Sequence, residues 1–209
     1  MDYYSRYDWV SNSFLKTIMG SEFPPNIDRI FEFGRLVHET ILEPEKANKS
    51  DKDYQLALKM RDTFYADRLC NSIMSYSNIK VEHEFYRKVS GLKRRCKADG
   101  VIKDCSLILE FKGLSSTNEK AFRESITHFD YDMGAAFYID TTGIDRELIV
   151  GVSKKNPEKL FRFMIERGDT FYISGRKKYI KAICDGLLKS SITDQISDPE
   201  QLQELINEI

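Results

Sequence analysis

Hydrophobic and polar residues alternate with a period of two near the middle of the chain. Residues 79–86 read Ile-Lys-Val-Glu-His-Glu-Phe-Tyr, and two more strand-like stretches follow over residues 92–102 and 107–112. Such alternation is typical of β-strands with one buried face. Ser90-Gly91 and Lys103-Asp104 separate the stretches as short turns. The pattern therefore predicts a three-strand antiparallel meander.

Helical spacing and apolar runs predict further elements on both sides of the meander. Phe33, Val37 and Ile41 recur every four residues and form the core face of an expected helix over residues 28–42. The other expected elements are a short helix beginning at Ser11 or Ser13, helices over 53–75, 119–127, 131–140 and 168–188, strands over 147–152 and 160–165, and a short helix within 190–209. This order predicts an α/β fold with a mixed central sheet flanked by helices.

Length and composition fit one domain. The chain has 209 residues, of which 41% are hydrophobic and 31% are charged, and this length allows a sizeable core. We expect a single domain over residues 1–209, with residues 190–209 as a C-terminal tail. The sequence has no apolar run of membrane-spanning length and begins without a signal segment. We therefore expect a cytoplasmic protein with no membrane partner.

The cysteines give no sign of a metal cluster. Cys70, Cys96, Cys105 and Cys184 are scattered and form no Cys-x-x-Cys pair. This argues against a zinc ribbon or a cysteine-ligated iron–sulfur cluster. Free thiols also suit a reducing compartment.

Charge is balanced over the whole chain but clustered locally. The net charge of −1 does not by itself indicate a nucleic-acid-binding protein. The two basic clusters are Arg87-Lys88 with Lys93-Arg94-Arg95 and Lys97, and Arg176-Lys177-Lys178 with Lys181. Basic runs are commonly solvated faces. The first cluster, however, leads directly to Asp99, and a phosphate substrate would suit such a run.

Asp99, Glu110 and Lys112 are the strongest candidates for chemistry. Residues 107–112 read Leu-Ile-Leu-Glu-Phe-Lys, a buried strand in which Glu110 and Lys112 share one face. Charges on a core strand are costly unless they are used. An antiparallel return of the chain brings Asp99 beside Glu110, and two carboxylates with a lysine can hold Mg²⁺ and orient a water. Alternatively, Glu110 and Lys112 form a pair on an exposed edge strand, and Asp99 is a turn residue.

His38 lies on the expected helix over residues 28–42, four residues after Gly34. One helix face therefore carries an imidazole above a position without a side chain, where another group could approach the backbone closely. A lone helix histidine is more often structural or solvated. From the helix alone, both interpretations of His38 stay open.

Several short segments resemble, in order, the motifs of one family. They are Val10–Lys16 (family pattern iSnS-x-L), Phe33–Glu39 with Leu42–Glu45 (fG-x-x-vHe and lEPe), Lys97–Gly100 (K-x-x-D or PD), Glu110–Lys112 ((D/E)-x-K) and Ala135–Tyr138 (the end of Q-A-A-x-Y). Over about residues 9–185, the chain resembles the PD-(D/E)xK nuclease superfamily, in particular the RecE and lambda-exonuclease-like phage recombination exonucleases. The resemblance implies a restriction-endonuclease-like core.

The resemblance also implies roles for the candidate residues. Asp99 and Glu110 would be metal ligands, and Lys112 would position the nucleophilic water. His38 would be a further ligand or would line the metal pocket. Glu82 would be the acidic residue of the first strand, with Glu84, placed on the same face, as the competing assignment.

The substrate side of the site follows from the same resemblance. Tyr138 would contact DNA or brace the site from its helix. The basic residues that we expect to bind DNA are Arg35, Arg94, Arg95 and Lys97. The implied cofactor is Mg²⁺, with Mn²⁺ as an alternative.

The chain departs from the family pattern at three places. Gly134 stands where the family has a glutamine, Ala98 where it has the proline of the PD pair, and Gly113-Leu114 where threonines often follow the lysine. The missing side chain at Gly134 either makes room for another group or reflects relaxed selection on a weakened enzyme. We expect the space to be occupied, because every proposed metal-site residue is present.

The function implied by the resemblance is Mg²⁺-dependent hydrolysis of DNA from duplex ends, in phage-type recombination or DNA processing. The setting would be a bacterial or phage-infected cell. The resemblance further implies a ring-shaped homo-oligomer and a single-strand annealing protein as partner. Two alternatives remain: a structure- or nick-specific DNA endonuclease on the same core, and a catalytically weakened DNA-binding or inhibitor protein.

Overall fold

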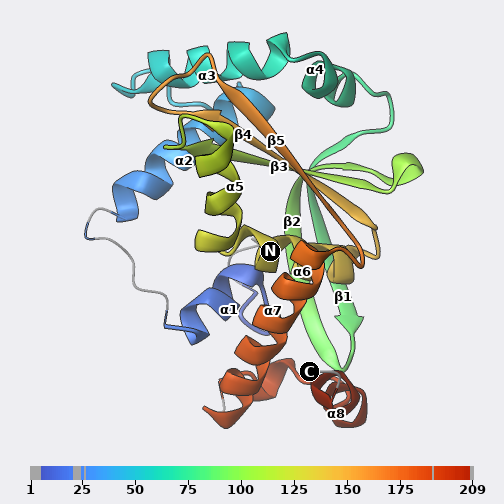
Figure 1. The fold of residues 1–209 in the computed structure, drawn as a ribbon. Helices are drawn as coiled ribbons and strands as arrows, with labels where there is room; N and C mark the ends of the chain where they lie inside the picture. The colour runs from blue at the N-terminus through green and yellow to red at the C-terminus, as the bar shows by residue number, and fades with distance from the viewer. Residues whose placement is uncertain (1–5, 21–24, 26, 190, 208–209) are drawn as a thin grey trace.

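A five-stranded sheet forms the centre of the computed structural model, which describes residues 6–20, 25, 27–189 and 191–207 (Figure 1). The strands are β1 (Lys80–Val89), β2 (Leu92–Ile102), β3 (Leu107–Leu114), β4 (Arg146–Ser153) and β5 (Leu160–Glu166), and they lie in this order in the sheet. β3 and β4 pair in parallel, and the other neighbours are antiparallel. The predicted meander and mixed sheet are confirmed.

Helices precede the meander, connect β3 to β4 and follow β5. They are α1 (Asn12–Ile18), α2 (Ile27–Leu42), α3 (Tyr54–Ala66), α4 (Arg68–Met74), α5 (Glu119–His128), α6 (Tyr131–Thr142), α7 (Thr170–Leu188) and α8 (Pro199–Asn207), with 3-10 turns η2 (Lys103–Cys105) and η3 (Thr193–Gln195). Because α5 and α6 form the crossover from β3, β4 can return parallel to it. Among the described residues, no helix combines the length and the apolar character that a membrane crossing requires.

The two faces of the sheet have separate hydrophobic cores. Leu109 and Phe111 of β3 pack with the buried faces of α2, α3 and α4. Ile108 and Leu114 of the same strand pack with α1, α5, α6 and α7 on the other face. The alternation within β3 therefore places helices on both faces, as a restriction-endonuclease-like α/β core requires. Glu110 and Lys112 share the second face with Ile108.

One predicted helix is two helices in the structure. The expected helix over residues 53–75 breaks at Asp67, whose backbone is extended at φ −71° and ψ 122°. The Asp67 side chain accepts hydrogen bonds from Leu69 N and Cys70 N at 3.1 and 3.0 Å and so caps α4. An N-cap aspartate stabilises a new helix start, and this local chemistry outweighs the continuous apolar stripe.

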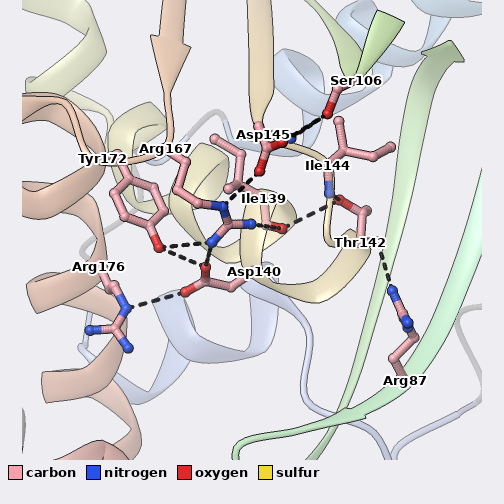
Figure 2. A network of polar contacts seen from close by, with 10 residues as sticks. All are labelled: Arg87, Ser106, Ile139, Asp140, Thr142, Ile144, Asp145, Arg167, Tyr172 and Arg176. Carbon is pink, nitrogen blue, oxygen red and sulfur yellow. Dashed lines mark hydrogen bonds and ion pairs between the residues drawn. The ribbon is translucent and has the colours of Figure 1, made fainter. Parts of the chain in front are cut away.

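A buried carboxylate ties α6 to the start of α7. Asp140 accepts hydrogen bonds from Tyr172 at 2.7 Å, from Arg167 at 2.8 Å and from Arg176 at 3.3 Å (Figure 2). It also accepts one from Tyr179. Burial opposes ionisation of Asp140, but these donors outweigh it and lower the pKa of the carboxyl. The network fixes the helix that carries Tyr138 and Gly134.

The C-terminal tail docks on the sheet end. Leu202 and Leu205 of α8 are buried, and Ser197 N donates to Gly91 O in the β1–β2 turn at 2.7 Å. The short helix expected within residues 190–209 is therefore present, and its weak apolar stripe is a packing surface.

Candidate active site

An open cleft of about 930 Å³ lies between α2, the meander and α6. α2 contributes His38 to its lining, the meander contributes Asp99, Glu110 and Lys112, and α6 contributes Tyr138. These residues come from distant parts of the sequence. The fold gathers them because α2 and α6 cover opposite faces of the sheet at this point.

Asp99 and Glu110 meet across the β2–β3 pair, as the sequence predicts. Gly100 pairs with Leu109, so the next register step sets Asp99 opposite Glu110. Asp99 Oδ2 accepts a hydrogen bond from the backbone N–H of Phe111 at 2.6 Å. Lys112 donates to Glu110 Oε1 from the same strand. The carboxylates and the lysine are therefore side by side, and the alternative of an exposed edge strand is wrong, because β3 is central in the sheet.

His38 connects α2 to this pair of strands. Its Nε2 lies 2.7 Å from Asp99 Oδ1, and its Nδ1 lies 3.3 Å from Glu82 Oε1. Glu82 also forms an ion pair with Lys97. His38, Glu82 and Asp99 each offer a ligand atom, and these atoms lie within 4.8 Å of one another. His38 thus lines the cleft in contact with two carboxylates and is not a solvated helix residue.

Glu82 and Glu84 have different positions relative to the cleft. Glu82 has a left-handed φ of 52° within β1 and points into the cleft. Glu84 is exposed and accepts a hydrogen bond from Tyr86 at 3.2 Å. Glu82 therefore lines the cleft, whereas Glu84, which lies opposite Lys97 in the β1–β2 pair, is not among its lining residues. A non-glycine residue with a left-handed φ is strained, and such strain is often found at functional sites.

The carboxylates perturb one another. Burial and the charge of Asp99 raise the pKa of Glu110 to about 7, against the effect of Lys112. Burial alone would raise the pKa of Asp99, but the charge of His38 and its hydrogen bond lower it. Burial lowers the pKa of His38, but Asp99 and Glu82 outweigh this and raise it to about 9. Opposing shifts within one cleft are typical of sites built for chemistry.

The donor set fits a divalent cation. Carboxylate oxygens suit Mg²⁺ and Mn²⁺, and an imidazole is a common further ligand. Glu110 Oε2 is buried without a hydrogen-bond partner among the described residues. A cation near Asp99 would neutralise the repulsion that raises the pKa of Glu110. The residues whose ligand atoms lie within 4.8 Å of one another are His38, Glu82 and Asp99. Glu110, which the sequence also predicts as a ligand, is not in this group but lines the same cleft.

Three of the expected substrate-binding residues line the cleft. Tyr138 faces it from α6, Arg35 from α2 and Lys97 from β2. Arg35 is exposed, and it lies one turn before His38 on the same helix face. These positions suit contact with a polyanion that enters the cleft.

Arg94 and Arg95 do not fit the substrate role expected from the sequence. Arg94 has 0% and Arg95 has 6% of its surface exposed. The Arg94 guanidinium lies 5.8 Å from the ring centroid of Phe137 and 5.3 Å from that of Tyr179. Most residues of β2 are buried, on both faces of the strand, so the basic run is only partly a surface feature. Arg94 is a structural cation in the α6–α7 core.

The structure brings residues into the site that sequence reasoning missed. Glu147 of β4 is buried, its Oε2 has no partner among the described residues, and burial and Glu110 raise its pKa. The Tyr131 ring lies 5.6 Å from Lys112 Nζ. Asn12 lines the cleft from α1. A charged residue at the start of an otherwise apolar strand is the one available sequence signal for Glu147.

Comparison with known proteins agrees with this arrangement. A family model described as a PDDEXK-like domain of unknown function (DUF3799) matches residues 15–189. The chain belongs to this family. The match runs from within α1 to just past the end of α7, and so includes His38, Asp99, Glu110 and Lys112. The PD-(D/E)xK resemblance of the sequence is thereby confirmed.

Solved structures align with this chain at low sequence identity, and the first of them shares its fold. A presumed exonuclease from Eubacterium rectale aligns with a TM-score of 0.64 at 14% identity, over 94% of this chain and 88% of that one. A phage-related exonuclease from Haemophilus somnus 129PT aligns with a TM-score of 0.46 at 14% identity, over 87% and 96% of the two chains. The alkaline exonuclease LHK-Exo from Laribacter hongkongensis has a TM-score of 0.45 at 14% identity, over 99% and 97%. None of the curated proteins matches the chain.

Proposed function

We propose that this protein is a Mg²⁺-dependent nuclease that hydrolyses DNA phosphodiester bonds from duplex ends, in phage-type recombination or DNA processing. The observation that carries the proposal is the convergence of Asp99, Glu110, Lys112 and His38 in one open cleft. Membership of a PDDEXK-like family supports it. Mn²⁺ would serve as an alternative cofactor.

The residues divide into those that hold the cation and those that hold the reacting groups. Asp99, Glu110 and His38 would hold the cation, with Glu82 beside them. The bound cation would stabilise negative charge on the phosphate during attack. Lys112, which donates to Glu110, would orient the water for in-line attack on phosphorus. The water oxygen bonds to phosphorus as the bond to the departing oxygen breaks, and the departing oxygen takes up a proton.

The cleft suits a polyanionic substrate. Arg35 and Lys97 reach it from α2 and β2, and Tyr138 faces it from α6. The Arg35 and Lys97 side chains would bind phosphates, and the Tyr138 ring would stack on a sugar or a base. We propose these three as the DNA-binding residues of the cleft.

Assembly and setting are proposed by resemblance alone. We propose a single-domain subunit in a ring-shaped homo-oligomer, acting in the cytoplasm with a single-strand annealing protein. The mass of the purified protein in solution, measured by light scattering, tests the oligomer. A monomeric mass at working concentration would end that part of the proposal.

The class of nuclease is tested with three DNA substrates. Linear duplex, covalently closed circles and nicked circles are incubated with the protein in Mg²⁺ or in EDTA. The proposal predicts release of nucleotides from linear duplex in Mg²⁺ alone, with closed circles intact. Nicking or linearisation of closed circles would favour an endonuclease. DNA binding without cleavage of any substrate would favour the weakened DNA-binding protein.

A further inference from the structure

A small inner cavity lies directly behind the candidate catalytic strand. Its volume is about 70 Å³, and Glu110, Lys112, Glu147, Gly134 and Asn12 are among its lining residues. Asn12 also lines the large cleft, so its side chain stands between the two spaces. Three oxygens around the cavity are buried and have no hydrogen-bond partner among the described residues: Asn12 Oδ1, Glu110 Oε2 and Glu147 Oε2. Buried polar atoms normally have partners, so the unpaired oxygen of the Asn12 amide needs an explanation.

The Asn12 amide takes up the space above Gly134. A Cβ atom on Gly134 would lie 3.0 Å from Asn12 Nδ2 and 3.6 Å from Asn12 Cγ. A side chain at position 134 would therefore press on the amide. Glycine is unfavourable inside a helix such as α6, and this close approach accounts for its presence. The expectation that the space at Gly134 is occupied is confirmed, and its occupant is a residue of the same chain.

The backbone that carries Asn12 is fixed to the sheet. Val10 N donates to Lys93 O, and Arg95 N donates to Val10 O, both at 2.8 Å. Ser11 is buried and caps α1 through Phe14 N at 3.2 Å. The start of α1 is thus held on β2, the strand that carries Asp99. Asn12 reaches the cleft from a rigid support, as a residue that positions a reacting group must.

We propose that Asn12 is a substrate-binding residue of the nuclease site and that Gly134 is the space it needs. Its amide N–H groups donate to a phosphate oxygen of the DNA beside Lys112, and so hold the scissile phosphate against the water. This inference rests on the proposed function. Neutral donors aimed at a phosphate stabilise the charge that develops on it during attack.

The test uses four variants and one control on linear duplex DNA in Mg²⁺. Asn12→Ala removes the amide, and Asn12→Asp keeps its shape but replaces the donor by a negative charge. Gly134→Gln adds a second amide where Asn12 already lies, and the double variant Asn12→Ala/Gly134→Gln offers that amide an open space. Thr17→Ala, on the exposed side of α1, is the control. Thermal melting establishes that each variant folds.

The expected results separate substrate binding from a structural role. Asn12→Ala should lower kcat/KM by about 10- to 100-fold and Asn12→Asp by roughly 100-fold or more, because loss of one such donor commonly costs about 100- to 1,000-fold. Gly134→Gln alone should also lower kcat/KM. The double variant should have a higher kcat/KM than either Asn12→Ala or Gly134→Gln. The control should stay within about twofold of wild type, as surface substitutions usually do.

Two kinds of failure are distinct. If wild type and Thr17→Ala cleave linear DNA but Asn12→Ala and Asn12→Asp cleave equally well, the role of Asn12 is wrong and the nuclease function stands. Independent effects of Asn12→Ala and Gly134→Gln would likewise overturn the steric coupling. If wild type and Thr17→Ala release no nucleotides, the proposed function fails and this inference fails with it.

Discussion

His38 Nε2 lies 2.7 Å from Asp99 Oδ1, so a helix near the start of the chain meets a central strand at one pair of side chains. Together with Glu82 they place three ligand atoms within 4.8 Å of one another. The first two predictions test whether this group holds a divalent cation.

Glu82 and Glu84 form a matched pair for testing the metal site. Glu82 faces the cleft, whereas Glu84 is exposed outside it. Added Mn²⁺ should raise the melting temperature of wild type and of Glu84→Gln, because a ligand that binds only the folded state stabilises it. Glu82→Gln should show a clearly smaller rise at the same Mn²⁺ concentration. Equal rises for both variants, measured by scanning calorimetry, would remove Glu82 from the site.

His38 should affect the metal requirement and not only the rate. We expect His38→Ala to lower nuclease activity by about 10-fold or more and to raise the Mg²⁺ concentration needed for half-maximal rate, since loss of a metal-site group commonly costs about 10- to 100-fold. His83→Ala is the control, because His83 lies on β1 and packs against Phe85. The measurement is cleavage rate against Mg²⁺ concentration. An unchanged Mg²⁺ requirement with a large loss of melting temperature would make His38 a structural residue.

Substitution of Arg94 should lower stability, whereas substitution of Arg35 should weaken DNA binding. Arg94 is fully buried beside Phe137 and Tyr179, whereas Arg35 is exposed at the cleft. Arg94→Ala should cost roughly 2–4 kcal/mol of unfolding free energy, because it leaves a cavity beside the two rings and removes a positive charge that faces Asp140. The folded fraction should bind DNA normally. Arg35→Ala should weaken binding at unchanged stability.

Fluorescence anisotropy with labelled duplex in Ca²⁺, paired with urea unfolding, measures both quantities. Loss of DNA affinity at full stability in Arg94→Ala would restore the substrate role that the sequence suggested for it.

Asp140 should make stability depend on pH in acid. Its side chain is 10% exposed. The charged and titratable groups facing it are Arg94 from β2 and Arg167, Tyr172, Arg176 and Tyr179 near or on α7. Its lowered pKa means that the unfolded chain binds more protons than the folded chain in acid. The Asp140 contribution is therefore complete above its unfolded pKa of about 3.9 and is lost as pH falls through the lower folded value.

Asp140→Asn should remove this contribution. At pH 7 the variant should lose roughly 2–4 kcal/mol of stability, because charged donors around Asp140 lose their carboxylate. Below about pH 4 the difference in unfolding free energy between wild type and variant should become smaller, because protonation neutralises the wild-type side chain. Urea unfolding at pH 7, 5 and 3.5 measures the gap. A gap of constant size would show that the carboxylate charge is not what stabilises the α6–α7 contact.

The central sheet could be predicted because it depends on local patterns. Alternation and turn residues gave the β1–β2–β3 meander, and the antiparallel return at η2 set Asp99 against Glu110. The break at Asp67 was missed because an N-cap hydrogen bond, and not hydrophobic periodicity, ends the helix there.

The rest of the site depends on contacts between distant segments. The burial of Arg94 follows from which face of β2 meets α6 and α7, and no local charge pattern contains that information. Asn12 lies against Gly134, although 122 positions separate the two residues in the sequence. Residue spacing alone left the roles of His38, Glu82 and Tyr138 open. The resemblance to the family motifs supplied the expected role of each.

The most direct test of the central claim is the rate of nucleotide release from linear duplex DNA by Glu110→Gln in Mg²⁺. This substitution keeps the shape of the side chain and removes the charge that would bind the cation. If Asp99 and Glu110 hold the cation, the cleavage rate of the folded variant should fall by at least about 100-fold, because stabilisation of the transition state by a metal ion is worth several kcal/mol. Retention of more than about a tenth of the wild-type rate, roughly 1.4 kcal/mol or less of lost stabilisation, would contradict the two-carboxylate metal site.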